Sequence, residues 1–188
     1  MIVIAGQQLL KEIIRMTRRG MLAIFALIFL FVVTGCANEP KSLEGKDIKE
    51  LVQYYSAGDF DNVSASITSH ELIVMEQNGK EEVYPLPEDE FFVSIAPFYE
   101  QTHPCAIHSL TGCQGELVEE EFAIYIEDDR GNVIMDKTIS SLKNGFIDLW
   151  LPRDKTLHIT IEHNGNKATE TISTFEGDRT CITTMQLS

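Results

Sequence analysis

Two cysteines and two histidines lie close together in the stretch HPCAIHSLTGCQGE, which covers residues 103–116. Thiol and imidazole groups bind soft and borderline metal ions, and paired thiols in an exported protein also form disulfides. Cys105 and Cys113 are therefore either a disulfide that staples a small fold or ligands for a metal ion. His103 and His108 are weaker candidate ligands, because histidines in loops are commonly solvated.

A third thiol follows in the strand-like run TCITTMQL, at residues 180–187. A strand period of two predicts that Cys181, Thr183 and Met185 share one face. One disulfide at most can form among Cys105, Cys113 and Cys181, so a folding staple alone would not need the third thiol. On its own, Cys181 also fits a small buried hydrophobic residue, and Met185 is better interpreted as core than as a ligand.

The donor types favour copper over zinc. Thiolate ligands favour Cu(I), whereas imidazole accepts either copper or zinc. The separation between Cys105 and Cys113 is wider than the CxxC spacing of zinc knuckles, so no zinc-finger motif is present. A Cys/His set could also supply the four ligands that zinc prefers, so the donor types alone rank copper, as Cu(I), only slightly above zinc.

Other functions find less support in the sequence. A thiol–disulfide redox protein using Cys105 and Cys113 is the main alternative, although the CxxC spacing of such proteins is missing. An adhesion or polymer-binding protein is a further alternative. Its binding groove would need exposed aromatic residues, and Trp150 is the only tryptophan in the sequence. The chain lacks a GxSxG elbow, an HExxH pair and a Gly-rich phosphate loop, and its paired carboxylates adjoin turns or prolines. We therefore predict a protein that is not an enzyme.

The first residues predict export and a lipid anchor. Arg18 and Arg19 precede the apolar run MLAIFALIFLFVV, which is short for a membrane span and suits a secretory signal. The run leads into VTGCA, which resembles the lipobox of bacterial lipoproteins, where the cysteine is diacylated. We therefore expect a lipoprotein signal peptide at residues 1–35, lipidation of Cys36, a polar tether at residues 36–46, and an extracytoplasmic, membrane-anchored protein.

The chain is strongly acidic. Twenty-nine acidic residues against 15 basic ones give a formal net charge of −14 over 188 residues. Such a body repels phosphate backbones, so nucleic acid is excluded as a partner. The carboxylates are scattered along the chain, which is typical of a solvated acidic surface.

The elements that must position the thiols fall into two predicted parts. Asp47 can cap a helix that Gly58 ends, residues 59–70 are assigned to a second short helix, and Asn78-Gly79 predicts a hairpin turn. These elements make an N-terminal α+β unit at residues 47–90.

Residues 91–188 are predicted to form a β-rich metal-binding domain. Phe122, Ile124 and Ile126 alternate on one face of a predicted strand. Further strand-like runs are separated by turn residues, as expected for an antiparallel sandwich or barrel, at residues 133–139, 146–151, 157–163 and 167–174. The pattern in residues 157–163 turns His158 outward. The predicted fold class is α+β, a small helix-plus-hairpin unit followed by a mainly antiparallel β-sandwich-like domain.

Three stretches, CAIHSLTGCQGE, SLKNGFIDLWLPRDKTLHITI and GDRTCITTMQL, resemble the CueP family of bacterial copper-binding proteins. The resemblance extends from about Leu43 to Leu187. It implies an extracytoplasmic protein that contributes to copper tolerance, holds copper and passes it as a metallochaperone to a copper/zinc superoxide dismutase. It also implies that Cys105, Cys113 and Cys181 are the copper ligands, with His103 and His108 as possible additions.

The expected partners follow from these predictions. They are the lipid membrane through acylated Cys36, a recipient cuproenzyme and, as an open option, a second copy of the chain. The predicted anchor differs from the freely diffusing carrier that the family implies. The staple and the metal site can also be one site in two redox states, a Cys105–Cys113 disulfide when oxidised and a Cu(I) ligand pair when reduced.

Overall fold

The computed structural model describes residues 47–188. The predicted signal peptide, the lipidation site Cys36 and the tether lie outside the described residues. Within the part of the chain that is described, no helix is long and apolar enough to span a membrane.

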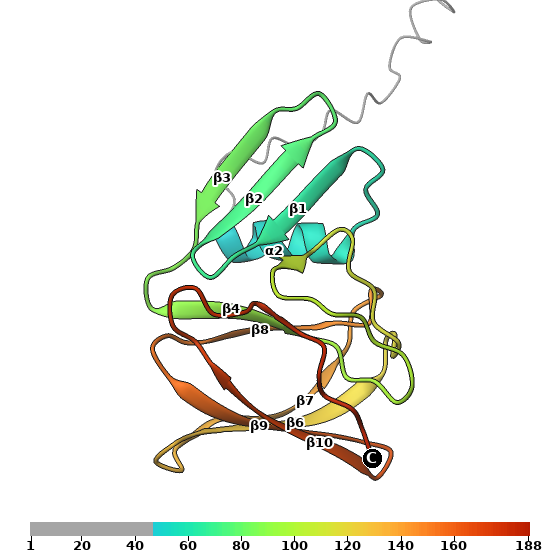
Figure 1. The fold of residues 1–188 in the computed structure, drawn as a ribbon, viewed down its shortest axis with the longest axis vertical. Coiled ribbons are helices and arrows are strands. Elements are labelled where there is room, and N and C mark those ends of the chain that lie inside the picture. The colour runs from blue at the N-terminus through green and yellow to red at the C-terminus, as the bar shows by residue number, and fades with distance from the viewer. Residues whose placement is uncertain (1–46) are drawn as a thin grey trace, which may run out of the picture. The chain divides into compact units, whose positions relative to one another are not determined.

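One helix, α2 (Ile48–Ala57), begins the described chain (Figure 1). The side chain of Asp47 accepts a hydrogen bond from the Lys49 backbone N–H at 2.8 Å, which satisfies one of the unpaired donors of the first turn. One face of the helix is buried through Leu51, Val52 and Tyr55. Both the capped start and the end before Gly58 confirm the predicted helix.

A four-stranded antiparallel sheet with the order β3-β2-β1-β5 lies on one side of α2 (Figure 1). The turn that joins β2 to β3 contains Gly79 at φ +86°, a conformation that glycine adopts without strain. This turn confirms the predicted hairpin. The prediction of a second helix in residues 59–70 is wrong, because this segment contains a strand that pairs along its whole length with its neighbour. The strands are β1 (Val63–Ile67), β2 (Glu71–Glu76), β3 (Glu81–Pro85) and β5 (His108–Ser109).

Two further sheets face one another across the main core (Figure 1). The first has the order β11-β4-β8, with β4 (Glu90–Ile95), β8 (Ile147–Pro152) and β11 (Cys181–Ile182). The second has the order β10-β9-β6-β7, with β6 (Glu121–Asp128), β7 (Val133–Ser140), β9 (Thr156–His163) and β10 (Asn166–Ser173). Alternating residues of both sheets fill the core, among them the fully buried Phe91, Phe122 and Ile161.

The prediction of a mostly β protein with antiparallel sheets and a preceding helix is confirmed. The strand pairings are antiparallel except that β11 runs parallel to β4, with Cys181 opposite Ser94. His158 lies on the outward face of β9, where its ring nitrogens contact Thr171 and Asp129 at 3.0 Å each. The division into an N-terminal unit at residues 47–90 and a metal-binding domain at residues 91–188 stays a prediction.

A half-buried carboxylate joins α2 to the β4–β8 strand pair. Asp148 on β8 accepts hydrogen bonds from Ser56 at 2.6 Å and from Ser94 at 2.5 Å. Lys49 adds a salt bridge to Glu90 at the start of β4. The helix is therefore fixed on the face of β4 and β8 that points away from the main core.

We expect Asp148→Ala to lower the free energy of unfolding by about 2 kcal/mol, because two hydroxyls lose a charged acceptor and the Ser94 hydroxyl is fully buried. Urea denaturation followed by circular dichroism measures the change. The exposed Asp136→Ala on β7 is the matched control and should cost under about 0.5 kcal/mol. Equal losses in the two variants would contradict the role given to Asp148.

Candidate metal centre

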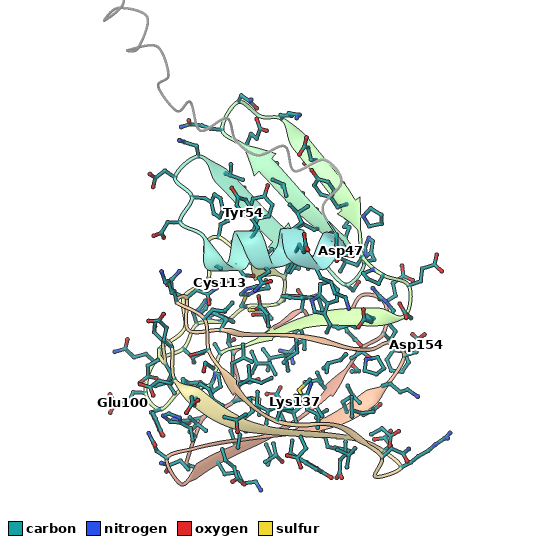
Figure 2. All side chains as sticks on the ribbon, turned by 180° about the vertical axis from the view of Figure 1, so that it is seen from behind. Asp47, Tyr54, Glu100, Cys113, Lys137 and Asp154 are labelled. Carbon is teal, nitrogen blue, oxygen red and sulfur yellow. The ribbon has the colours of Figure 1, made fainter. Side chains whose placement is uncertain are left out.

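Five candidate metal donors lie close together, four from the segment between β4 and β6 and one from β11. His103, Cys105 and Cys113 lie on the irregular segment between β4 and β6, which β5 interrupts at His108. Cys181 is the first residue of β11. Figure 2 shows Cys113 beneath α2, on the side of Tyr54 rather than that of the capping residue Asp47.

The donors form two overlapping groups around Cys113. In one group the donor atoms of His103, Cys105 and Cys113 all lie within 4.8 Å of one another. In the other, the same holds for His108, Cys113 and Cys181. The two sulfurs of Cys105 and Cys113 are 3.6 Å apart, and Cys181 Sγ lies 3.5 Å from His108 Nδ1. The three thiols are free.

The loop that contains Cys113 is positioned by the close backbone approach of two glycines, Gly115 and Gly145. A Cβ on Gly115 would lie 2.5 Å from the carbonyl oxygen of Gly145, and a Cβ on Gly145 would lie 2.6 Å from that of Gly115. Gly145 also has φ +76°, and the Gly115 N–H donates to the Asn144 carbonyl at 2.6 Å. Only glycine fits this backbone approach, which holds the Cys113 loop against the residues that lead into β8.

Glu116 fixes residues 99–101, at the start of the irregular segment between β4 and β6. One of its carboxylate oxygens accepts hydrogen bonds from the backbone N–H groups of Tyr99, Glu100 and Gln101 at 2.9 to 3.0 Å. These donors, that of Gln101 first, hold the pKa of the Glu116 carboxyl below its usual range. The segment that leads to His103 and Cys105 is thereby tied to the segment that leaves Cys113.

Thr180 positions Cys181 beside His108. Its buried hydroxyl donates to the Ile67 carbonyl on β1 at 2.6 Å and accepts from the His108 N–H at 3.1 Å. Its backbone N–H donates to the Ala106 carbonyl at 3.0 Å. One residue thus connects the segment that carries Cys181 to β1, to β5 and to the loop next to Cys105.

The inner part of the cluster is enclosed by apolar groups. His108 and Cys181 are both 0% exposed, and the His108 ring packs against Phe146 at a centroid distance of 4.5 Å. Cys113, Cys181, Phe146 and Ala96 form a small buried cluster, against which the half-buried Cys105 packs. Among the described residues, His108 Nε2 is the one buried side-chain polar atom without a hydrogen-bond partner.

The hydrogen bonds of the cluster concentrate negative charge on Cys113. Contacts from Cys181, His108 and His103 lower the pKa of the Cys113 thiol far below its usual range, against the effect of burial. The pKa of Cys181 is raised, because its proton is held by the Cys113 sulfur and because it is buried. Burial also raises the pKa of Cys105. Of the three thiols, that of Cys113 therefore loses its proton most readily.

The structure corrects two predictions about individual residues. Cys181 and Met185 do not share a face: β11 ends at Ile182, so the strand period does not continue, and Met185 packs in the main core while Cys181 faces the thiol cluster. The alternative that His108 is a solvated loop histidine is wrong, because β5 pairs with β1 and buries the ring. His103 remains partly exposed.

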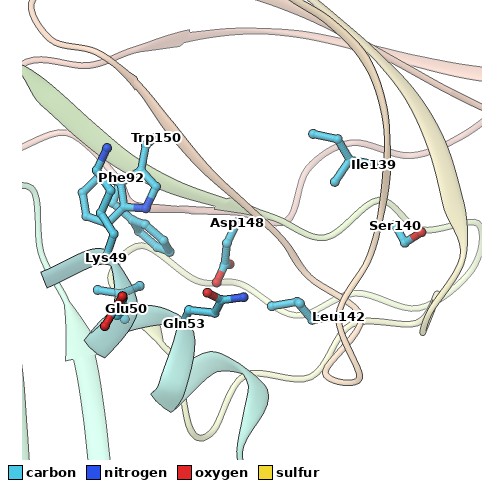
Figure 3. A pocket seen from close by; sticks show the side chains of 10 residues that line it. Lys49, Glu50, Gln53, Phe92, Ile139, Ser140, Leu142, Asp148 and Trp150 are labelled. Carbon is cyan, nitrogen blue, oxygen red and sulfur yellow. The ribbon is translucent and has the colours of Figure 1, made fainter. Parts of the chain in front are cut away.

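Other clefts lack this combination of donors. A cavity of about 340 Å³ lies between α2 and β8, and its walls include Lys49, Gln53, Asp148 and Trp150 (Figure 3). No cysteine or histidine lines it. Lys49 Nζ lies 5.3 Å from the centre of the Trp150 ring, so the single tryptophan is partly covered by a cation.

The family model described as periplasmic copper-binding protein CueP matches residues 48–186. The chain belongs to the CueP family. A solved crystal structure, that of S.CueP, is 37% identical to this CueP chain, with 78% of this chain and 91% of that chain covered and a TM-score of 0.74. No curated protein matches the chain.

The donor set of this CueP protein fits a soft metal ion. Thiolates and imidazole suit copper, and hard oxygen-preferring ions would find no carboxylate in either donor group. With metal–thiolate bonds of about 2.3 Å, two sulfurs on one ion lie about 4 Å apart at trigonal angles. The 3.6 Å separation of Cys105 and Cys113 is close to that value.

We expect Thr180→Val to lower the free energy of unfolding by about 3 kcal/mol, because the buried Ile67 carbonyl and His108 N–H both lose their partner. Urea denaturation of the reduced, metal-free protein measures this. The same substitution at the exposed Thr184, whose hydroxyl bonds only to Glu170, should cost under about 1 kcal/mol. A Thr180→Val protein as stable as the wild type would disprove the role of this hydroxyl.

Proposed function

We propose that this CueP protein sequesters copper as Cu(I) through the thiolates of Cys105, Cys113 and Cys181, with His103 and His108 as additional donors. It binds and releases the ion by ligand exchange and carries out no turnover chemistry. Zinc is the competing ion for the same donors. The observation that carries the proposal is the convergence of three free thiols and two imidazoles on one sulfur, Cys113.

The electrostatics of the cluster support a cation site. The lowered pKa of Cys113 makes it the thiol that ionises most readily, which favours the first metal–sulfur bond there. The raised pKa values of Cys105 and Cys181 mean that these thiols give up their protons less readily when they bind the ion. Each thiol that binds the ion as a thiolate must lose its proton, so binding weakens in acid.

We further propose that the protein acts outside the cytoplasm, tethered to the membrane by an acylated Cys36, and contributes there to copper tolerance. A tethered carrier can still pass Cu(I) to a recipient cuproenzyme such as a copper/zinc superoxide dismutase, provided that the recipient reaches the half-buried Cys105. The description of the family as periplasmic supports the proposed location outside the cytoplasm.

We expect the triple variant Cys105→Ser/Cys113→Ser/Cys181→Ser to lose Cu(I) affinity by at least about 100-fold, because the hydroxyls that replace the thiolates are poor ligands for a soft ion. A competition titration of the reduced protein against a chromophoric Cu(I) chelator, under argon, measures this. Replacing His158, an exposed histidine on the outer face of β9, by Ala is the matched control and should leave the affinity unchanged. Wild-type affinity in the triple variant would refute the site.

A thiol–disulfide redox protein is the second candidate, favoured by the 3.6 Å contact between the sulfurs of Cys105 and Cys113. In that case the pair would exchange readily with external thiols, and Cys181 would act as the resolving thiol. The two candidates differ in what oxidation does to copper binding.

For a copper site, we expect oxidation of the Cys105–Cys113 pair to lower Cu(I) affinity by at least about 100-fold, because one thiol of the three remains. The pair is oxidised, its disulfide is verified by mass spectrometry, and the titration is repeated. Equal affinity of the oxidised and reduced proteins would contradict the copper site. A pair that remains oxidised in strongly reducing buffer, without thiol exchange, would exclude the redox candidate.

A further inference from the structure

The two donor groups differ in their exposure to solvent and in the backbone that carries them. His103 and Cys105 are partly exposed and lie on irregular backbone, where the Cys105 thiol contacts the Ile107 carbonyl at 3.4 Å. His108 and Cys181 are fully buried and lie on strands that are hydrogen-bonded to β1 and β4. Cys113, 9% exposed, belongs to both groups.

One Cu(I) ion does not need all five donors, since two or three soft ligands are enough to hold it. The two groups of mutually close donors share Cys113, and the thiols of Cys105 and Cys181 also interact with each other. Because His103 and Cys105 are partly exposed whereas His108 and Cys181 are fully buried, an ion held by the first group lies nearer the solvent than one held by the second. The geometry provides two adjacent positions with one sulfur in common.

We propose that copper occupies these positions in succession. It first binds at an entry position formed by His103, Cys105 and Cys113, and then moves to a storage position formed by Cys113, Cys181 and His108. The Cys113 sulfur stays bound to the ion while the ion moves from the entry position to the storage position. This inference rests on the proposed copper function and adds the route by which the ion enters and leaves the buried site.

The transfer step balances without an external reactant. The bond between Cu(I) and the Cys105 sulfur breaks, and a bond to the Cys181 sulfur forms. The proton that leaves the Cys181 thiol replaces the one that Cys105 lost when the ion arrived. Copper remains Cu(I), and no electron or net charge enters or leaves the cluster.

The surface around the entry position suits exchange with another ligand. Residues 102–114 contain no Asp, Glu, Lys or Arg, although the whole chain has a net charge of −14. Pro104, Ala106 and Ile107 around Cys105 are exposed. An anionic copper–thiolate donor or acceptor therefore meets no charged side chain of this segment as it approaches Cys105.

The test measures which thiols one bound copper protects. Full-length reduced protein is loaded with one equivalent of Cu(I) from a chromophoric chelator under argon and exposed to iodoacetamide, and each cysteine is then mapped by mass spectrometry. We expect Cys105 to be alkylated at close to its rate in the metal-free protein, while Cys113 and Cys181 stay protected. Metal-free protein gives the reference rate for each thiol.

Protection of Cys105 as complete as that of Cys113 would overturn the two-position route, because all three sulfurs would then hold one ion. A wild-type protein that takes no Cu(I) from the chelator would instead overturn the proposed function, and this inference with it. The two failures are thus distinguishable in a measurement that needs no variant and no assumption about its folding.

Two matched variants add a kinetic readout. Cys105→Ser should capture Cu(I) from the chelator at least about 10-fold more slowly in stopped-flow, and it should lose less equilibrium affinity than Cys181→Ser. Cys181→Ser should keep rapid capture and lose affinity by about 10- to 100-fold. Circular dichroism checks the fold of each. Equal losses of affinity in both variants, without a difference in capture rate, would also overturn the route.

Discussion

The donor cluster depends on the hydrogen bonds around Thr180. This single buried residue bonds to Ile67 on β1, to His108 on β5 and to Ala106 in the loop, while its carbonyl accepts from the Ser94 N–H on β4. Polar groups buried in this way must find partners, so the four segments are held in one arrangement. Cys181 follows directly in the chain and inherits its position from that arrangement. The candidate donors from distant segments are thus brought together by a hydrogen-bonded backbone junction.

The irregular segment between β4 and β6 combines fixed ends with an accessible middle. The Gly115–Gly145 approach and the Glu116 carboxylate anchor the residues on either side of the thiols. The backbone next to Cys105 is bound mainly through Ala106, and the side chains around it are exposed. Cys181, in contrast, is fully buried on a strand that pairs with β4. This difference in exposure is consistent with the proposed roles of the two thiols.

Much of the fold follows from local patterns, and less of the site does. The Asp47 cap, the Asn78-Gly79 turn and the alternation along β6, β9 and β10 are properties of neighbouring residues, and each is found as predicted. The prediction of a helix fails at β1 because its alternating pattern, VSASI, is only five residues long, and because pairing with β2 decides its conformation. The proximity of Cys105 and Cys113 follows from a bent loop. The arrival of Cys181 and the burial of His108 depend on the β11–β4 and β5–β1 pairings, which no local pattern encodes.

The Thr180–Ile67 bond joins residues that are 113 positions apart, and the Thr180–His108 bond joins residues 72 apart. Contacts of such high sequence separation close large loops and form late in folding. While the chain is still folding, Cys105 and Cys113 are close in sequence and can meet each other before Cys181 reaches them. The complete donor set is therefore assembled only once β11 has paired with β4. In an oxidising compartment, the interval before docking is also the time at which the two loop thiols are most exposed to being joined prematurely.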